Sequence, residues 1–266
     1  MSILARKNKV LLKELIKTDF KLRYQGSVLG YLWAILRPLL MFAILYIVFA
    51  KVLKFGGDIP HYPVYLLTGI VLWSFFTECT GQGIHAIEQR GDLLRKLNFP
   101  KYIVVVSATA TAVINLLINL CVVVIFALLN GATPSWSWLL VIPSIIELYA
   151  LTLGVSLLLG AINIKFKDIG SIWDVLMQAM FYAVPIIYPI SMVASASPFI
   201  AKIILLNPIS QAIQDIRHNL ITSEAITGWG YIGIWWSLLS ILLVILTVAI
   251  GAAYFRKRAP YLAEEV

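Results

Sequence analysis

The chain has 266 residues, of which 61% are hydrophobic and 13% charged, and its formal net charge is +8. Soluble domains contain roughly 45–50% apolar residues, so a soluble fold has no means of burying this many apolar side chains. Because the apolar runs recur along nearly the whole chain and the basic residues flank them, the composition favours one integral membrane domain and argues against a nucleic-acid-binding protein.

The N-terminal segment, residues 1–33, is basic and amphipathic. Over residues 10–23, apolar side chains share one helical face and lysines occupy the opposite one. The apolar set is Leu11, Leu12, Leu15, Ile16 and Phe20, and the lysines are Lys13, Lys17 and Lys21. This spacing predicts an interfacial helix along the inner leaflet. The segment lacks an apolar core followed by a small-residue cleavage site, so we expect no cleavable signal peptide.

Six apolar segments follow, each near the roughly 20 residues that a helix needs to cross about 30 Å of hydrocarbon. They cover approximately residues 34–54, 62–84, 102–129, 138–162, 173–191 and 231–255. Residues 130–134, Asn-Gly-Ala-Thr-Pro, supply the turn that separates the third segment from the fourth. The sequence therefore predicts an all-α, polytopic membrane protein with a six-span domain over residues 34–255.

Residues 192–228, between the fifth and sixth spans, are too short and polar for two crossings and too apolar for a free loop. We expect two short re-entrant helices in the outer leaflet, broken at Asn207-Pro208.

The basic residues predict the orientation. All but four of the 21 Lys and Arg residues fall on one side of the membrane when both chain ends are placed on that side. The four exceptions are Lys51, Lys54, Lys202 and Arg217. Because positively charged loops stay in the cytoplasm, we expect both termini, including a tail over residues 256–266, to be cytoplasmic.

The sequence offers little that could carry out catalysis. It has no zinc-protease, serine-hydrolase or Cys/His ligand pattern, and His85 with Glu88 is a lone pair at a span end. It also has no phosphate-binding loop for ATP. Cys79 and Cys121 lie in apolar runs, where packing is their expected role. We expect no catalytic residue, no metal and no cofactor in this chain, so energy from ATP would come from another subunit.

Three acids lie within the spans: Glu78, Glu147 and Asp174. A proton relay needs a chain of such groups, and these three are scattered, which disfavours proton-coupled transport. Glu78 and Asp174 lie toward the cytoplasmic ends of their spans, where a helix-end contact is a sufficient reason for an acidic residue. A gating role is the alternative.

Two spans carry aromatic side chains away from the bilayer edges. Phe42, Tyr46 and Phe49 follow helical spacing in the first span, and the fifth span holds Phe181, Tyr182 and Tyr188. Such a stripe could stack on sugar rings without holding them tightly. Packing between helices is the alternative.

The connection from residue 82 to residue 100 has a short helical pattern outside the membrane. Apolar Leu93, Leu94 and Leu97 lie beside the charged set Arg90, Asp92, Arg95 and Lys96, and the pattern stops at residues 98–100. Apolar residues next to charges suggest docking to a cytoplasmic protein. A helix on the membrane surface is the alternative.

Read together, five segments resemble the permease subunit of the type-2 ABC exporters, in the branch that moves O-antigen, teichoic acid and similar lipid-linked glycans. In chain order they are RYQGSVLG (23–30, with Trp33 and Pro38), LLRKLNFP (93–100), FKDI (166–169), PIIY (185–188) and NP (207–208). Their order matches the family along almost the full chain.

The resemblance implies a homodimer with two copies of an ABC ATPase subunit, which binds the ATP and Mg, in the bacterial cytoplasmic (inner) membrane. A lipid-linked glycan would be the cargo, as in O-antigen export for lipopolysaccharide biosynthesis. Residues 85–100 would couple to the ATPase together with the loop near 165–170. The implied coupling residues are Arg90, Leu93, Leu94, Arg95, Lys96, Leu97, Phe99, Lys167 and Asp168.

The resemblance also implies that the first and fifth spans line the channel and that the outer segment helps form a gate. The nearest alternative is a drug, lipid or peptide exporter of the same superfamily. A proton-coupled carrier and a membrane-embedded enzyme are more distant ones, and the lack of an ATPase partner would favour them.

Overall fold

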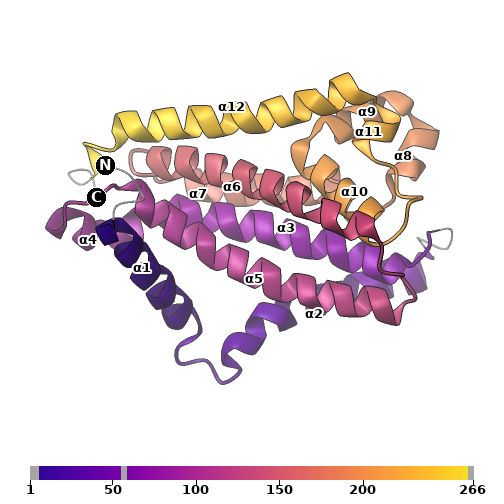
Figure 1. The fold of residues 1–266 in the computed structure, drawn as a ribbon, viewed down its shortest axis with the longest axis horizontal. Helices are drawn as coiled ribbons and strands as arrows, with labels where there is room; N and C mark the ends of the chain where they lie inside the picture. Colours follow the sequence, from indigo (N-terminus) through magenta and orange to yellow (C-terminus); the bar gives the residue numbers. More distant parts are fainter. Residues whose placement is uncertain (1–5, 55–58, 263–266) are drawn as a thin grey trace.

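The computed structural model describes residues 6–54 and 59–262, and over these residues every regular element is a helix (Figure 1). The all-α prediction is therefore confirmed. Residues 1–5 and 263–266, which belong to the predicted N-terminal segment and tail, lie outside the described residues.

Long helices run side by side along the long axis of the molecule (Figure 1). They are α3 (Tyr62–His85), α5 (Tyr102–Leu129), α6 (Val141–Asn163), α7 (Ile169–Ala183) and α12 (Ile234–Arg258). Five stretches of the described residues are long and apolar enough to cross a membrane: Gly30–Val52, Tyr62–His85, Tyr102–Leu129, Trp136–Asn163 and Ile234–Arg258. These stretches agree with five of the six predicted spans.

The predicted fifth span is only partly helical. Helix α7 has 15 residues, which at 1.5 Å per residue reach about 22 Å, less than the bilayer core. The chain then leaves helical geometry at Val184 and stays irregular to Pro189, just before helix α8 (Ile190–Ala196). Pro185 and Pro189 explain why the helix ends at Ala183, because a proline disfavours helical geometry in the preceding residue. The span predicted at 173–191 is thus a short helix followed by an irregular stretch of turns and bends.

The first span consists of three kinds of helix. A 3₁₀ turn (Gly30–Leu32) precedes α2 (Trp33–Leu45), and the π-helical segment Tyr46–Val52 follows. The amide of Leu53 bonds the carbonyl of Val48, 2.9 Å away, which is the i to i−5 pairing of a π-helix. The uniform α-helical spacing assumed for Phe42, Tyr46 and Phe49 therefore does not hold beyond Leu45.

The segment between α7 and α12 contains four short helices where two were expected. They are α8 (Ile190–Ala196), α9 (Pro198–Leu206), α10 (Pro208–Leu220) and α11 (Gly228–Tyr231). The first two of the three breaks each combine a capping side chain with a proline: Ser197 and Asn207 accept hydrogen bonds from the amides of Ile200 and Ile209, and each precedes a proline. The helices gather at one end of the bundle (Figure 1), here named the α10 end.

The opposite end, here named the α4 end, holds α4 (Gly91–Lys96), the first turns of α1 (Arg6–Tyr24) and the last turns of α12 (Figure 1). Helix α1 includes the predicted interfacial helix and extends it toward the N-terminus. Because α1 begins and α12 ends at the same end of the bundle, the chain crosses the bundle an even number of times.

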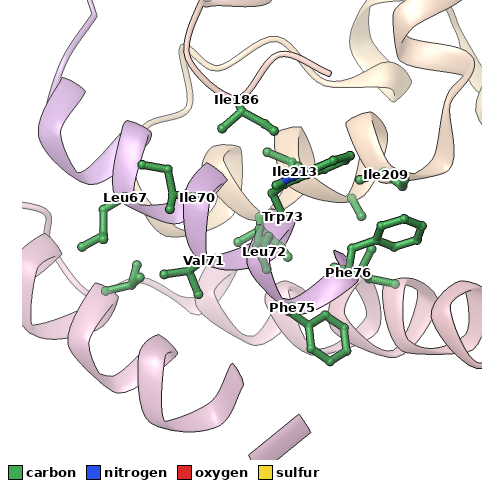
Figure 2. Close-up of a cluster of buried hydrophobic side chains, with 14 of the residues drawn as sticks. Leu67, Ile70, Val71, Leu72, Trp73, Phe75, Phe76, Ile186, Ile209 and Ile213 are labelled. Carbon is green, nitrogen blue, oxygen red and sulfur yellow. The ribbon is translucent and has the colours of Figure 1, made fainter. Parts of the chain in front are cut away.

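Helix α3 forms the centre of the core. Apolar side chains from Leu67 to Phe76 project from it in several directions and meet Ile186, Ile209 and Ile213 (Figure 2). In the most apolar 18 residues of Tyr62–His85, 78% of the residues are buried, against 11% in those of Gly30–Val52. The first span is thus left largely uncovered by the rest of the chain.

Glycines bring α6 and α12 into close contact. A Cβ added to Gly154 would lie 2.8 Å from the backbone nitrogen of Val248, and one added to Gly251 would meet the carbonyl oxygen of Gly154. Small residues at such crossings let backbones approach closely in membranes.

Gly154→Ala should therefore lower the unfolding temperature in detergent, at a cost of about 1–3 kcal/mol for the forced separation of the helices. Gly81→Ala is the matched control, because a Cβ at Gly81 meets nothing within 4 Å and alanine favours helix. Equal unfolding temperatures for the two variants would contradict the tight crossing.

Candidate functional site

Three of the six predicted path aromatics meet at the α10 end. Phe49, Tyr182 and Tyr188 line an apolar pocket of about 380 Å³ with Ile187 and three residues of α8. The Tyr188 hydroxyl donates to the carbonyls of Tyr182 and Ala183, 3.2 and 3.0 Å away, and so caps the last turn of α7. The pocket walls therefore come from the first span, the unwound end of the fifth span and the outer segment.

The other three aromatics make contacts inside the chain. Phe42 stacks on Tyr46 at 5.5 Å between ring centroids and meets Phe126 edge-on at 6.1 Å. Phe181 meets Trp73 edge-on at 6.2 Å. Phe42, Tyr46 and Phe181 are half-buried against the core, so part of the aromatic set packs helices together.

A line of polar side chains runs along the exposed face of α7, beside the exposed apolar Ile172, Val175 and Leu176. Asp174, Gln178 and Tyr182 follow one another at four-residue spacing and are all exposed, with Tyr182 at 69%. An ionisable group facing hydrocarbon costs several kcal/mol. In the membrane this polar stripe must therefore face water or another protein surface.

Arg217 of α10 is fully buried and holds the outer segment to the bundle. It donates to the carbonyls of Tyr65 (3.0 Å), Pro185 (2.5 Å) and Ile186 (2.7 Å) and to Oε1 of Gln214 (3.0 Å), and its guanidinium lies 3.5 Å from the centroid of the Tyr65 ring. The carbonyls of Pro185 and Ile186 lie in the irregular stretch after α7, where no helix supplies their hydrogen-bond donors. Sequence reasoning counted Arg217 only as an outer-side cation and missed this role.

A second polar cluster surrounds Glu78 of α3. Arg23 and Asn115 donate to Oε1 of Glu78 at 2.5 and 2.7 Å. These residues line a cavity of about 690 Å³ between the end of α1, α2, α3 and α5, together with Arg37 and Trp33. Glu78 is thus an ion-paired residue of this cavity. Glu147 is half-buried, and its buried Oε1 atom has no hydrogen-bond partner in the described part of the chain.

The predicted coupling segment, residues 85–100, forms ion pairs with α1 and with Lys167 at the α4 end. Arg90 forms an ion pair with Asp19 of α1. Glu88 accepts a hydrogen bond from Nζ of Lys167, 2.9 Å away, and this bond lowers the pKa of Glu88 from its ordinary value, so the carboxylate is charged at neutral pH. His85 Nδ1 lies 3.8 Å from the same carboxylate.

The predicted coupling residues divide into two groups by exposure. Leu94 and Phe99 are buried and Leu93 is half-buried, so these three pack within the chain together with Leu15 of α1, and the half-buried Arg90 is paired with Asp19. The exposed members are Arg95, Lys96, Leu97, Lys167 and Asp168. Only the exposed group is available to contact another subunit.

The described residues contain no group of three or more His, Cys, Asp or Glu side chains placed to hold a metal ion. The chemistry that the arrangement offers is recognition: an aromatic pocket, a polar stripe on an otherwise apolar helix, and an exposed basic and apolar tip at the α4 end.

Comparison with known proteins adds to this description. Residues 10–221 match the family described as ABC-2 type transporter. The chain is 31% identical over 248 residues to the O-antigen export system permease protein RfbA of Klebsiella pneumoniae, a match that covers 93% of this chain and 91% of that protein. It is 32% identical over 187 residues to the RfbA of Myxococcus xanthus, covering 70% and 71%. It is 24% identical to the polysialic acid transport protein KpsM of Escherichia coli, covering 94% of each chain.

Proposed function

Because the chain belongs to the ABC-2 type transporter family and to its polysaccharide-export branch, we propose that it is the permease subunit of an ATP-driven exporter for a lipid-linked polysaccharide of the O-antigen or teichoic-acid type. The permease itself would break no bond. Two copies would associate with two ATPase subunits in the cytoplasmic membrane, with both termini in the cytoplasm.

The observation that carries this proposal is the free face of α7. Asp174, Gln178 and Tyr182 form a polar stripe on an apolar helix, and the stripe ends at the pocket of Phe49 and Tyr188. A second copy facing this stripe would enclose a path with water and polar groups along its length and aromatic rings at its outer end. Such a path suits a sugar polymer, because hydroxyl groups need hydrogen-bonding partners and ring faces stack on aromatic side chains.

The exposed first span supports the same arrangement. Its outward side chains include Met41, Ile44 and Ile47, which a neighbouring copy or lipid would cover. Weak stacking favours movement, since tight binding of the polymer at one position would lower the energy of that state and slow the next step.

The aromatic pocket provides the test. In cells depleted of the natural chain, Phe49→Ala with Tyr182→Ala should lower the rate at which glycan appears on the cell surface roughly tenfold, because two ring contacts of about 0.5–1.5 kcal/mol each are lost. The readout is surface glycan by antibody or lectin binding, at matched membrane levels of permease.

Phe199→Ala is the matched control, because Phe199 is 71% exposed on α9 and lies outside the pocket lining. It should export at the rate of the unmodified chain. Normal export by the double variant would contradict the aromatic path. Normal surface glycan in cells that lack the chain altogether would contradict the proposed cargo and favour a drug or lipid exporter.

A further inference from the structure

Helix α1 carries a row of lysines whose charges are not paired within the described part of the chain. Lys9, Lys13, Lys17 and Lys21 follow one another at four-residue spacing and all are exposed. None takes part in an ion pair there, and Asp19 on the same helix is paired with Arg90. Like charges at this spacing destabilise a helix, so the row has a cost that a bound anion would offset.

An apolar groove runs beside the lysine row. Leu12, Ile16 and Phe20 form one wall, and Tyr31 and Ile114 of the bundle side form the other, around a volume of about 720 Å³. Phe20 stacks on Tyr31 with 5.0 Å between centroids and 12° between planes, which joins the two walls. The four lysines line the same groove.

We propose that this groove is a binding site for an anionic phospholipid, with an acyl chain along the apolar walls and the phosphate on the lysine row. The combination decides the class of ligand. Inorganic phosphate would leave the apolar walls exposed to water, and a zwitterionic lipid would leave the four positive charges with less compensation. Only an anionic lipid satisfies both features, and near a membrane surface each Lys or Arg adds about 1 kcal/mol of attraction to such lipids.

The position of the site gives it a role beyond anchoring. Helix α1 also carries Asp19, which holds Arg90 of the coupling segment, and Arg23, which holds Glu78 of α3. A lipid that fixes α1 therefore fixes two contacts of the bundle at once. This inference does not depend on the identity of the cargo.

Native mass spectrometry of the full chain tests the site, with phosphatidylglycerol and phosphatidylcholine of identical acyl chains as probes. The unmodified chain should bind phosphatidylglycerol preferentially. Lys13→Gln with Lys17→Gln should weaken phosphatidylglycerol binding roughly thirtyfold, as expected for the loss of two interfacial lysines. Lys7→Gln with Lys257→Gln removes the same charge from exposed lysines at the α4 end that do not line the groove, and it should bind like the unmodified chain.

Ile114→Trp tests the apolar half of the site, because it fills the groove and leaves the charge unchanged. It should also weaken phosphatidylglycerol binding, and millimolar inorganic phosphate should not compete. Thermal unfolding in detergent verifies that each variant is folded. Equal binding of the two lipids, equal loss in both lysine pairs, no effect of Ile114→Trp, or full competition by phosphate would each overturn the proposal.

Discussion

Arg217→Ala should lower the unfolding temperature in detergent by about 10 °C, the largest effect on stability expected for a single substitution in this chain. The side chain is fully buried and satisfies the carbonyls of Tyr65, Pro185 and Ile186. Its removal leaves three buried acceptors without donors, each at a cost of about 1–3 kcal/mol, partly recovered by local rearrangement. Arg217→Lys should recover part of the loss, because an ammonium group can reach some of these oxygens.

Two further variants make this expectation specific. Lys202→Ala removes the same charge from an exposed position on α9 and should leave the unfolding temperature within about 1 °C. Gly69→Ala places a Cβ against the guanidinium of Arg217 and should also destabilise, but it should add little once Arg217 is already alanine, because the two substitutions disrupt one contact. Two results would contradict the role of Arg217 in holding the outer segment to the bundle. One is an additive loss of stability in the double variant, and the other is an Arg217→Ala protein as stable as Lys202→Ala.

Leu97→Asp combined with Arg95→Glu should weaken binding of the proposed ATPase subunit at least about tenfold and lower export accordingly. Leu97 is 49% exposed, Arg95 is exposed, and both belong to the tip of the coupling segment. A buried charge and a reversed charge in a protein contact both oppose association. The measurement is co-purification of the ATPase with the permease, followed by the export rate per ATP hydrolysed.

Leu94 is the wrong position for this test, although the sequence pattern groups it with Leu97. Its side chain is buried against the permease itself, so Leu94→Asp would destabilise the chain and confuse folding with docking. Tyr261→Asp is the matched control, because Tyr261 is 54% exposed just after α12. If the double variant co-purifies and exports like Tyr261→Asp, the exposed tip is not the docking surface.

The long helices could be predicted from sequence because each one has a long apolar run with a turn signal at its limit. The stretch Asn130–Pro134 separates α5 from α6 as expected. The fifth span was harder, because hydropathy continues past Ala183 while the backbone does not remain helical. Pro185 and Pro189 were visible in the sequence, and giving them more weight would have shortened the helix.

The outer segment shows the limit of composition-based reasoning. The predicted break at Asn207-Pro208 is confirmed, and Ser197-Pro198, ten residues earlier, has the same capping chemistry and forms a second break that the prediction lacked. Helix α11 has only four residues, too few for any periodic pattern to reveal.

Arg217 could not have been assigned its role from sequence. Its partners are backbone carbonyls, which have no residue signature, and they lie 152, 32 and 31 positions away along the chain. Hydropathy reasoning treats an arginine near a span as a topological marker. Here burial among acceptors makes it a structural residue. In contrast, the exposed Asp174 and Gln178 carry a signal that sequence can reveal, namely polar residues at four-residue spacing on an apolar helix.

The π-helical segment Tyr46–Val52 has a consequence for the phase of the first span. A π turn is equivalent to an α-helix with one residue inserted, so side chains after it are rotated by about 100° relative to a continuous helix. Phe42, before this segment, meets Phe126, and Phe49, inside it, lines a pocket with Tyr182 and Tyr188. Deleting a single residue such as Val48 would be absorbed by conversion of the π turn to α-helix and would keep Phe49 at its pocket, whereas conversion to α-helix at unchanged length would turn Phe49 away by about 100°. The direction of this ring therefore depends on the extra residue that the π turn holds, as well as on composition.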